Sequence, residues 1–367
     1  MFSFFRRKAP SPPPEPTFNE RVIEFWTWFQ QVAPRFTAAI DARKCADLTD
    51  ETSARVDQLQ AGFAWVYGPG ADRCGHSLTL SGEGVEHRQL LALHWLSLAP
   101  TIPGWTLYAS RQSGPIKGHV ITMEDLRIDP KELWVTPTIN PETEKIDLVV
   151  WHHEWERITE KKRWTVVFLF LDEVLGEYGT QWWIGEISFG KDHLAASFPL
   201  EELGDYVATT IQAQEWKRAA PGEEWTGFKI KPATESYPRC DLITISTCAP
   251  ELFRTYMKEK DAMSDLLAGS GADFIYISID HGFFPEGDEI TKRAAVEEAL
   301  DDALKSQNAG RVLGGGFGTE RGYIDLLIYD GARSLATVRT VLKEHRVPSG
   351  TMIEFFARDK RARRISL

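Results

Sequence analysis

The sequence has few cysteines and no long apolar run. Its four cysteines, Cys45, Cys74, Cys240 and Cys248, are too few for a disulfide scaffold in 367 residues, and none stands at a metal-ligand spacing. They indicate free thiols in a reducing compartment. No apolar run approaches the ~20 residues that a membrane helix needs, and the basic residues 6–8 follow apolar ones, the reverse of a secretory signal. We therefore expect a cytoplasmic protein that contacts no membrane.

The sequence also lacks the motifs that identify common enzyme classes. Ser270 lies between two glycines without the longer pattern of a nucleophile elbow, and no serine–histidine or cysteine–histidine system can be assembled. The glycines of 314–318 lie between two expected strands, so they predict a bulged hairpin and not a phosphate loop. Residues 151–156 hold ligand-type side chains without a further ligand elsewhere, and we expect a polar strand face at a sheet edge. The sequence therefore predicts no catalytic residue, no metal and no cofactor.

Charge is unevenly distributed along the chain. The net charge is −11, yet residues 6–8 carry +3 and residues 358–367 carry +4. Without these two segments the rest of the chain carries −18. Such an acidic body repels nucleic acid and anionic lipid, so we expect neither as a partner. The basic residues 358–367 are interpreted as a short solvated tail.

The length and composition predict a globular protein of at least two domains. A chain of 367 residues exceeds what one hydrophobic core usually serves, and 43% hydrophobic residues exclude bulk disorder. Residues 1–17 are rich in proline and predict a disordered leader. We expect an N-terminal α+β domain over 18–220, a C-terminal domain over 221–357 and the basic tail over 358–367.

Hydrophobic periodicity predicts the elements of the N-terminal domain. Pro34 should end or kink the first helix near its last turn. The continuous apolar run Trp164–Phe170 is interpreted as a buried strand. The expected helices include 19–36, 86–98 and 200–213, and the expected strands include 133–137, 146–152 and 164–170.

The last third of the chain, residues 272–357, predicts the order strand–helix–strand–strand–helix–strand. This is the order of a ferredoxin-like βαββαβ unit, so the expected fold class is α+β. In such a unit one four-stranded antiparallel sheet carries both helices on the same face. The residues expected to share the core beneath the helices are Ile275, Ile277, Val296, Leu300, Ile324, Leu326, Val338 and Leu342.

Three short segments resemble a bacterial family that is known only as domain of unknown function six-nine-five. They are Phe25–Phe29, the apolar-Pro-Gly-Trp passage of Ala99–Trp105, and Leu171–Tyr178. The resemblance covers roughly residues 18–200. It implies a bacterial, cytoplasmic protein, and it brings no activity and no catalytic residue with it.

Acidic residues follow the apolar run at 164–170. Asp172, Glu173 and Glu177 lie within two turns of an expected short helix, and its spacing would bring Glu173 and Glu177 together. Two close carboxylates can differ in pKa and so serve acid–base chemistry. Glu186 and the adjacent Trp182 and Trp183 make a sugar or aromatic ligand conceivable, although core packing also explains these tryptophans. A hydrolase or carbohydrate-active enzyme is therefore an alternative function.

Aromatic residues alternate along the strands of the C-terminal unit. Tyr276, Tyr323 and Tyr329 belong to the face opposite the two helices, together with Phe274, Ser278, Asp325 and Leu327. RNA-recognition folds stack bases on such a face, but Asp325 replaces one stacking aromatic and repels phosphate. A face this apolar needs cover, either from the N-terminal domain or from a partner. We expect cover from within the chain, since a tethered domain has a high effective concentration.

The leading hypothesis is a non-enzymatic binding or regulatory protein, of the kind that includes inhibitors and immunity proteins. It would engage another protein through the exposed sheet face or through a groove between domains. The candidate contact residues are Tyr276, Tyr323, Tyr329, Glu173, Glu177, Trp182 and Trp183. An RNA-metabolism regulator acting through the ferredoxin-like domain is the weaker alternative. The sequence leaves the partner and the oligomeric state open.

Overall fold

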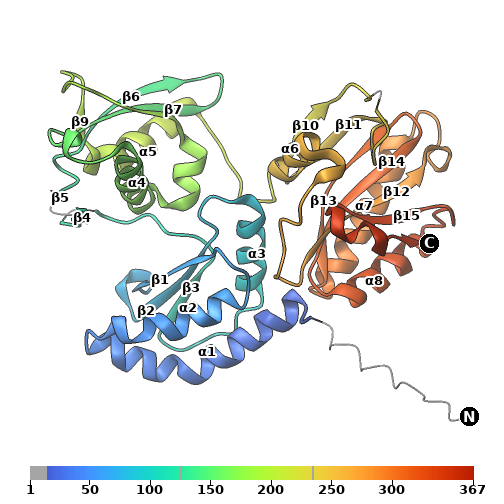
Figure 1. Cartoon of the computed structure of the whole chain (residues 1–367), viewed down its shortest axis with the longest axis horizontal. Coiled ribbons are helices and arrows are strands. Elements are labelled where there is room, and N and C mark those ends of the chain that lie inside the picture. The colour runs from blue at the N-terminus through green and yellow to red at the C-terminus, as the bar shows by residue number, and fades with distance from the viewer. Residues whose placement is uncertain (1–14, 117, 124–125, 234) are drawn as a thin grey trace, which may run out of the picture.

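A computed structural model describes residues 15–116, 118–123, 126–233 and 235–367. Its mixture of helices and several sheets confirms the α+β class. Three groups of elements follow one another along the chain (Figure 1). The first group contains α1 (Phe18–Asp41), α2 (Thr49–Asp57), β1 (Ala64–Pro69), β2 (His76–Ser81), α3 (Glu86–Ser97) and β3 (Trp105–Tyr108).

The second group forms the upper left part of Figure 1 around one long helix. Its main sheet has the order β8-β7-β6-β9, and β4 pairs with β5 separately. The elements are β4 (Ile121–Met123), β5 (Leu126–Ile128), β6 (Trp134–Asn140), β7 (Lys145–Trp151), α4 (Glu160–Trp183), β8 (Ile184–Phe189), β9 (Phe198–Pro199) and α5 (Leu203–Gln214). The predicted hairpin of 133–137 and 146–152 is confirmed as β6 and β7.

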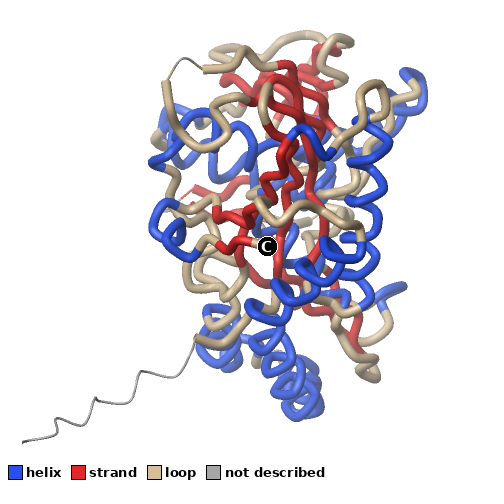
Figure 2. Tube along the Cα trace, turned by 90° about the vertical axis from the view of Figure 1, so that its right-hand side faces the viewer, coloured by secondary structure: helices blue, strands red, loops and turns tan. Residues whose placement is uncertain are grey.

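The third group is built on a seven-stranded sheet of order β10-β11-β13-β14-β12-β15-β16, which has helices on both sides (Figure 2). Its strands are β10 (Thr226–Lys229), β11 (Leu242–Thr247), β12 (Asp273–Asp280), β13 (Gly310–Gly318), β14 (Arg321–Ile328), β15 (Met352–Phe355) and β16 (Ile365–Ser366). Its helices are α6 (Pro250–Glu259), α7 (Glu289–Ser306) and α8 (Gly331–Glu344). The predicted sheet of four strands is therefore extended by β10 and β11 at one edge and by β16 at the other. The prediction of a solvated tail over 358–367 is wrong, because β16 pairs with β15 and Lys360 forms ion pairs with Asp265 and Asp273.

The glycines of β13 explain how this extension forms. A side chain at Gly314 would place its Cβ 2.6 Å from the Ser246 carbonyl oxygen, and one at Gly316 would meet the Thr244 carbonyl oxygen. Only glycine therefore lets β11 approach β13 closely enough to pair. The pairing of β13 with β14 shifts register between Val312 and Gly314, which confirms the predicted bulged hairpin.

The apolar residues form three clusters. The eight residues expected to share a core all lie in the cluster beneath α7 and α8. A second cluster contains only residues between Ile116 and Trp216. The third joins residues 18–109 to residues 242–356, so the first group of elements and the large sheet share one core. The predicted domain boundary near residue 220 comes directly after the last residue of the second cluster, Trp216. The same boundary separates residues 18–109 from residues 242–356, which pack together in the third cluster.

Two sequence interpretations of the second group are wrong. Trp164–Phe170 is not a strand but part of α4, because its buried residues Val166, Val167 and Phe170 follow helical spacing while Phe168 is 45% exposed. Residues 152–156 do not extend β7 as a polar strand face. The strand ends at Trp151, and His152 is buried against Trp155 in a turn.

Pro34 does not end α1, which continues to Asp41. Proline removes one helical hydrogen bond and usually kinks a helix. Burial of Phe36 beyond the proline, in edge-on contact with Trp28 and Phe29, stabilises the continuation of the helix.

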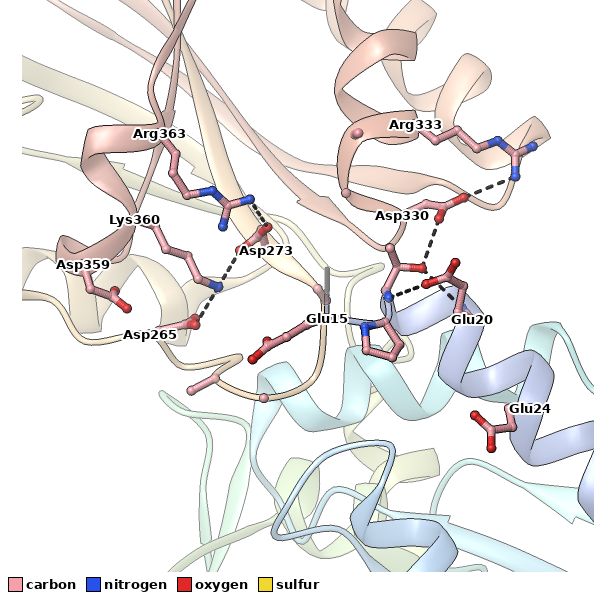
Figure 3. Close-up of a pocket in the computed structure, with 18 residues that line it drawn as sticks. Glu15, Glu20, Glu24, Asp265, Asp273, Asp330, Arg333, Asp359, Lys360 and Arg363 are labelled. Carbon is pink, nitrogen blue, oxygen red and sulfur yellow. Dashed lines mark hydrogen bonds and ion pairs between the residues drawn. The ribbon is translucent and has the colours of Figure 1, made fainter. Parts of the chain in front are cut away.

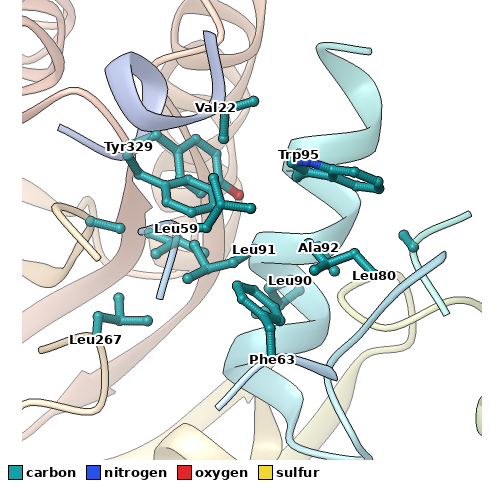
Figure 4. Packing of buried hydrophobic residues seen from close by; sticks show 14 of the residues in the cluster. Val22, Leu59, Phe63, Leu80, Leu90, Leu91, Ala92, Trp95, Leu267 and Tyr329 are labelled. Atoms are coloured by element: carbon teal, nitrogen blue, oxygen red, sulfur yellow. The ribbon is translucent and has the colours of Figure 1, made fainter. Parts of the chain in front are cut away.

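The first turn of α1 docks on the third group of elements. The amides of Phe18 and Asn19 donate to the carbonyls of Gly271 and Tyr329 at 3.3 and 3.2 Å. These amides have no partner within their own helix, so the sheet satisfies them. Leu91 and Trp95 of α3 pack into the same cluster (Figure 4). The junction is therefore a hydrogen-bonded, apolar interface within the chain.

Candidate functional site

The aromatic sheet face predicted as a contact surface is covered. Tyr276 and Tyr323 are 2% exposed and Tyr329 is 4% exposed. The ring of Phe356 lies 5.2 Å from Tyr276 and 5.4 Å from Tyr256 of α6, and His94 of α3 stacks on Tyr329. In this structure these three tyrosines therefore do not form a surface for a partner or for RNA bases. The cover comes from within the chain, but the expected N-terminal domain supplies only part of it: α3 packs on Tyr329, whereas α6 and Phe356 of the C-terminal part cover Tyr276.

An arginine fills the centre of that covered face. Arg239 is buried, and its guanidinium lies between 4.9 and 5.3 Å from four ring centroids, those of Tyr256, Tyr276, Tyr323 and Phe356. Its Nη1 lies 3.1 Å from Oδ1 of Asp325. Asp325, which stands where an RNA-recognition fold has a stacking aromatic, is thus the counter-ion of a buried arginine. The space between the four rings is already filled by the Arg239 guanidinium.

A large acidic groove lies where α1 meets the third group of elements (Figure 3). Its volume is about 1060 Å³. Four segments line it: the residues around the start of α1, the connection before β12, the start of α8, and residues 359–363. It contains seven carboxylates, Glu15, Glu20, Glu24, Asp265, Asp273, Asp330 and Asp359, against three cations, Arg333, Lys360 and Arg363.

The three cations of the groove are already paired. Lys360 Nζ lies 2.7 Å from Asp265 and 2.6 Å from Asp273, and Arg363 lies 3.7 Å from Asp273. Arg333 pairs with Asp330 at 3.2 Å. Among the described residues that line the groove, four negative charges therefore remain in excess.

The four groove carboxylates that are not paired with a groove cation differ in their interactions. Glu20 closes a capping box with Thr17 at the start of α1, and Glu24 pairs with Arg55 at 3.3 Å. Within the described part of the chain, Glu15 and Asp359 have neither an ion pair nor a side-chain hydrogen bond. These two side chains are available to a cationic ligand.

A smaller pocket, the α4 pocket, lies between α4 and the turn after β2. Its volume is about 430 Å³. Glu177, one of the predicted site residues, lines this pocket and is 3% exposed. Its carboxylate accepts hydrogen bonds from Ser81 Oγ at 2.7 Å, from the Gly84 amide at 3.1 Å and from Gln89 Nε2 at 2.9 Å. Glu177 thus ties α4 to the first group of elements.

A break in α4 directs Glu177 into this position. Gly176 has φ +74° and ψ 165°, which is outside the helical region. The Glu177 amide that the break releases donates to the Arg111 carbonyl at 3.0 Å, and the Gly114 amide donates to the Glu173 carbonyl at 2.7 Å. The break therefore lets the segment after β3 hydrogen-bond with the open helix.

The same break separates the two glutamates that were expected to lie together. Glu173 is half exposed and lies 3.6 Å from His119, whereas Glu177 is bound by the donors named above. Trp182 packs on Tyr178, and Trp183 stacks on Trp216. Neither tryptophan lines the pocket, and the exposed Glu186 does not either. The predicted carbohydrate-type arrangement of these residues is not assembled.

Asp172, and not Glu173 as predicted, is the acidic residue that shares the α4 pocket with Glu177. It lines the α4 pocket, and burial raises its pKa to about 6, an effect strengthened by Glu177 and Glu83 and opposed by Thr180 and Arg111. The sequence signal for this residue was its position in the acidic run before Gly176. No sequence signal indicated Glu83 or Thr180, which reach the pocket only through the fold.

Comparison of the chain with family models, with curated proteins and with solved structures found no match. Among the described residues, no group of three or more histidine, cysteine, aspartate or glutamate side chains is placed to hold a metal ion. No helix in the described ranges is both long and apolar enough to span a bilayer.

Proposed function

We propose that the protein is a non-enzymatic binding protein that holds a basic segment of another protein in the acidic groove. The observation that carries this proposal is the excess of four carboxylates in a groove whose cations are all paired. Charge complementarity of this kind steers a cationic partner into place and rejects acidic ones. The volume of about 1060 Å³ suits several residues of an extended peptide better than one small molecule.

The test is titration of an arginine- and lysine-rich octapeptide into the full chain by calorimetry. We expect binding that weakens with salt, because charge attraction at an exposed groove is screened. The double variant Glu15→Lys with Asp359→Lys changes the charge of the groove by four and should weaken binding about tenfold or more. Asp192→Lys, an exposed change in the second group of elements, serves as the control. Equal binding of a neutral peptide, or no effect of the double variant, would sink the proposal.

The hydrolase alternative has weaker support. The raised pKa of Asp172 is its one favourable observation, since carboxyl groups with altered pKa values are common in active sites. Against it, Glu177 is fully occupied by three donors, and Glu173, Trp182 and Trp183 lie outside the pocket. Glu83, the third carboxylate that lines the pocket, is bound by Arg111.

We also propose that residues 272–357 form a ferredoxin-like unit inside the larger sheet. The order β13-β14-β12-β15 with antiparallel neighbours supports this, as does the placement of α7 and α8 over one core. We further propose that residues 18–200 belong to the uncharacterised bacterial family that they resemble, and that the protein is cytoplasmic.

A further inference from the structure

The α4 pocket has one acidic and one apolar side. Glu83, Asp172 and Glu177 line it, and so do Phe168, Ile184 and Ile187. The volume of about 430 Å³ falls in the range of small-molecule sites, which are mostly apolar with a few placed polar groups. Phe168 is 45% exposed, which is unusual for a phenylalanine beside a cavity of this size.

Two of the three carboxylates already have partners. Arg111 Nε and Nη2 donate to Glu83 Oε1 at 3.1 and 2.8 Å, and Glu177 accepts from Ser81, Gly84 and Gln89. Within the described part of the chain Asp172 has no ion pair, and its hydrogen-bonding neighbour is the Thr180 hydroxyl. The pocket therefore contains one carboxylate whose charge the protein leaves uncompensated.

A second polar group in the pocket has an unused acceptor. Thr180 is 8% exposed, and apart from the neighbouring Asp172 carboxyl its hydroxyl has no hydrogen-bond partner among the described protein atoms. Donation of this hydroxyl toward Asp172 lowers the pKa of that carboxyl. The hydroxyl oxygen can therefore still accept a hydrogen bond from a ligand in the cavity that it lines.

We propose that the α4 pocket binds a small organic cation, a primary ammonium group carried on an apolar body. The ammonium group donates to Asp172 and to the Thr180 hydroxyl oxygen, and the apolar body packs on Phe168 and Ile187. An ammonium group has three donors and no acceptor, which matches one carboxylate and one hydroxyl oxygen. This site is separate from the acidic groove and does not depend on the function proposed for it.

Ligand binding at this site depends on pH in a defined direction. The groups that face Asp172 are Arg111 from the segment after β3, Glu83 from the turn after β2, and Thr180 and Glu177 from α4. With the pKa of Asp172 at about 6, the carboxyl is ionised at pH 7.5 and mostly protonated at pH 5. A protonated carboxyl attracts an ammonium group much less, so affinity falls about tenfold between these pH values.

The experiment is calorimetric titration of the full chain with 2-phenylethylamine and with its neutral analogue 2-phenylethanol. We expect the amine to bind and the alcohol to bind at least about tenfold more weakly, because the alcohol has one donor where the ammonium group has three and carries no charge to neutralise Asp172. A capped lysine amide, titrated alongside, tells whether the ammonium group comes from a free amine or from a lysine side chain of a partner.

Three variants locate the ligand. Asp172→Asn should weaken amine binding about tenfold and remove its dependence on pH. Thr180→Val keeps the shape of the side chain and removes the hydroxyl, so it should weaken amine binding while changing the melting temperature little. Glu173→Gln is the matched control, an acidic neighbour on the same helix that does not line the pocket and should leave affinity unchanged.

Equal affinity for the amine and the alcohol would overturn the proposal. So would wild-type affinity in Asp172→Asn, or an equal loss in Glu173→Gln. The groove variant Glu15→Lys with Asp359→Lys should bind the amine as the wild type does, which separates the failure of this site from the failure of the groove.

Discussion

At the scale of single residues, the covered sheet face depends on one buried ion pair. The side chain of Arg239 is 0% exposed and that of Asp325 is 5% exposed, and four aromatic rings surround the guanidinium. Removing both charges from such a pair often costs little, whereas removing one leaves the other buried and uncompensated. The pair therefore makes the face intolerant of single changes at either position.

Asp325→Ala should lower the free energy of unfolding by about 3–5 kcal/mol, because it leaves the Arg239 charge without a counter-ion. The double variant Arg239→Met with Asp325→Leu should recover most of this loss. Urea denaturation followed by fluorescence measures both. As a control, Arg254→Gln breaks an exposed pair with Glu251 and should cost less than about 1 kcal/mol. A double variant no more stable than Asp325→Ala would contradict this account.

Tyr276→Asp should destabilise the whole protein by more than about 4 kcal/mol, because it removes one of the rings around Arg239 and buries a second carboxylate beside a guanidinium that Asp325 already neutralises. Tyr276→Phe keeps the ring and is the matched control, with an expected change below about 1.5 kcal/mol. Thermal melting is the measurement. Unchanged melting of Tyr276→Asp would mean that the face opens in solution and is accessible to a partner.

At the scale of elements, α4 shows how an interruption creates a site. The segment Leu171–Tyr178 continues the apolar run as one helix, but Gly176 opens it and turns Glu177 toward α3. A Cβ at Gly176 would lie 2.9 Å from the Arg111 carbonyl oxygen and 3.0 Å from the Ser113 amide nitrogen. The break is therefore required by the packing of the segment after β3 and not only by backbone preference.

Gly176→Ala should destabilise the protein by about 1–3 kcal/mol, because alanine is strained at φ +74° and its Cβ meets the crossing backbone. It should also weaken amine binding, since Asp172 and Thr180 lie on either side of the break. Gly179→Ala, three residues further along the same helix, is the control and should change stability by no more than about 1 kcal/mol. Chemical denaturation and the amine titration check both effects, and similar losses in the two variants would argue against a special role for the break.

At the scale of the whole molecule, the half-buried Glu86 and the buried His94 lie at the junction between the first group of elements and the large sheet. Glu86 at the start of α3 accepts from the amides of Glu251 and Leu252 at 3.1 and 3.2 Å, and so caps α6 from another part of the chain. His94 lies 2.6 Å from Asn19 Oδ1 and stacks on Tyr329 at 3.7 Å. Burial raises the pKa of Glu86 to about 7 and lowers that of His94 to about 3.

These two shifts act on stability in opposite directions between pH 5 and pH 7. The raised pKa of Glu86 stabilises the fold at low pH, and about 2 kcal/mol of this is lost as pH rises to 7. The lowered pKa of His94 stabilises the fold at neutral pH, and about 2 kcal/mol is lost as pH falls to 5, because the unfolded chain then binds the proton. Their combined effect on the wild type is small.

Single variants should therefore reveal opposite pH dependences. Relative to the wild type, Glu86→Gln should gain about 2 kcal/mol of stability as pH rises from 5 to 7, and His94→Gln should lose about as much. Urea denaturation at pH 5, 6 and 7 measures the difference in the free energy of unfolding between each variant and the wild type. Taking this difference cancels the contribution of all other titratable groups. Differences that do not change with pH would show that these groups have ordinary pKa values in the folded protein.

Patterns with a clear period were predictable from the sequence, because they arise from local geometry. The strands and helices of residues 272–357, and the core beneath them, follow from alternation and helical spacing. The prediction of a strand at Trp164–Phe170 failed because a continuous apolar run has no period. In the sequence such a run in a partly buried helix cannot be told from a buried strand. The break at Gly176 was likewise invisible, since it depends on a carbonyl from residue 111.

By itself the sequence determined the α+β class, the C-terminal order of elements, the bulged hairpin and the need to cover the tyrosine-bearing face. Each of these depends on residues close together in the chain. Only the tertiary structure decided what covers that face, that Arg239 neutralises Asp325, and that the acidic groove and the α4 pocket exist. These features join side chains from distant segments, and the physical reason is that burial and charge pairing depend on distance in space and not along the chain.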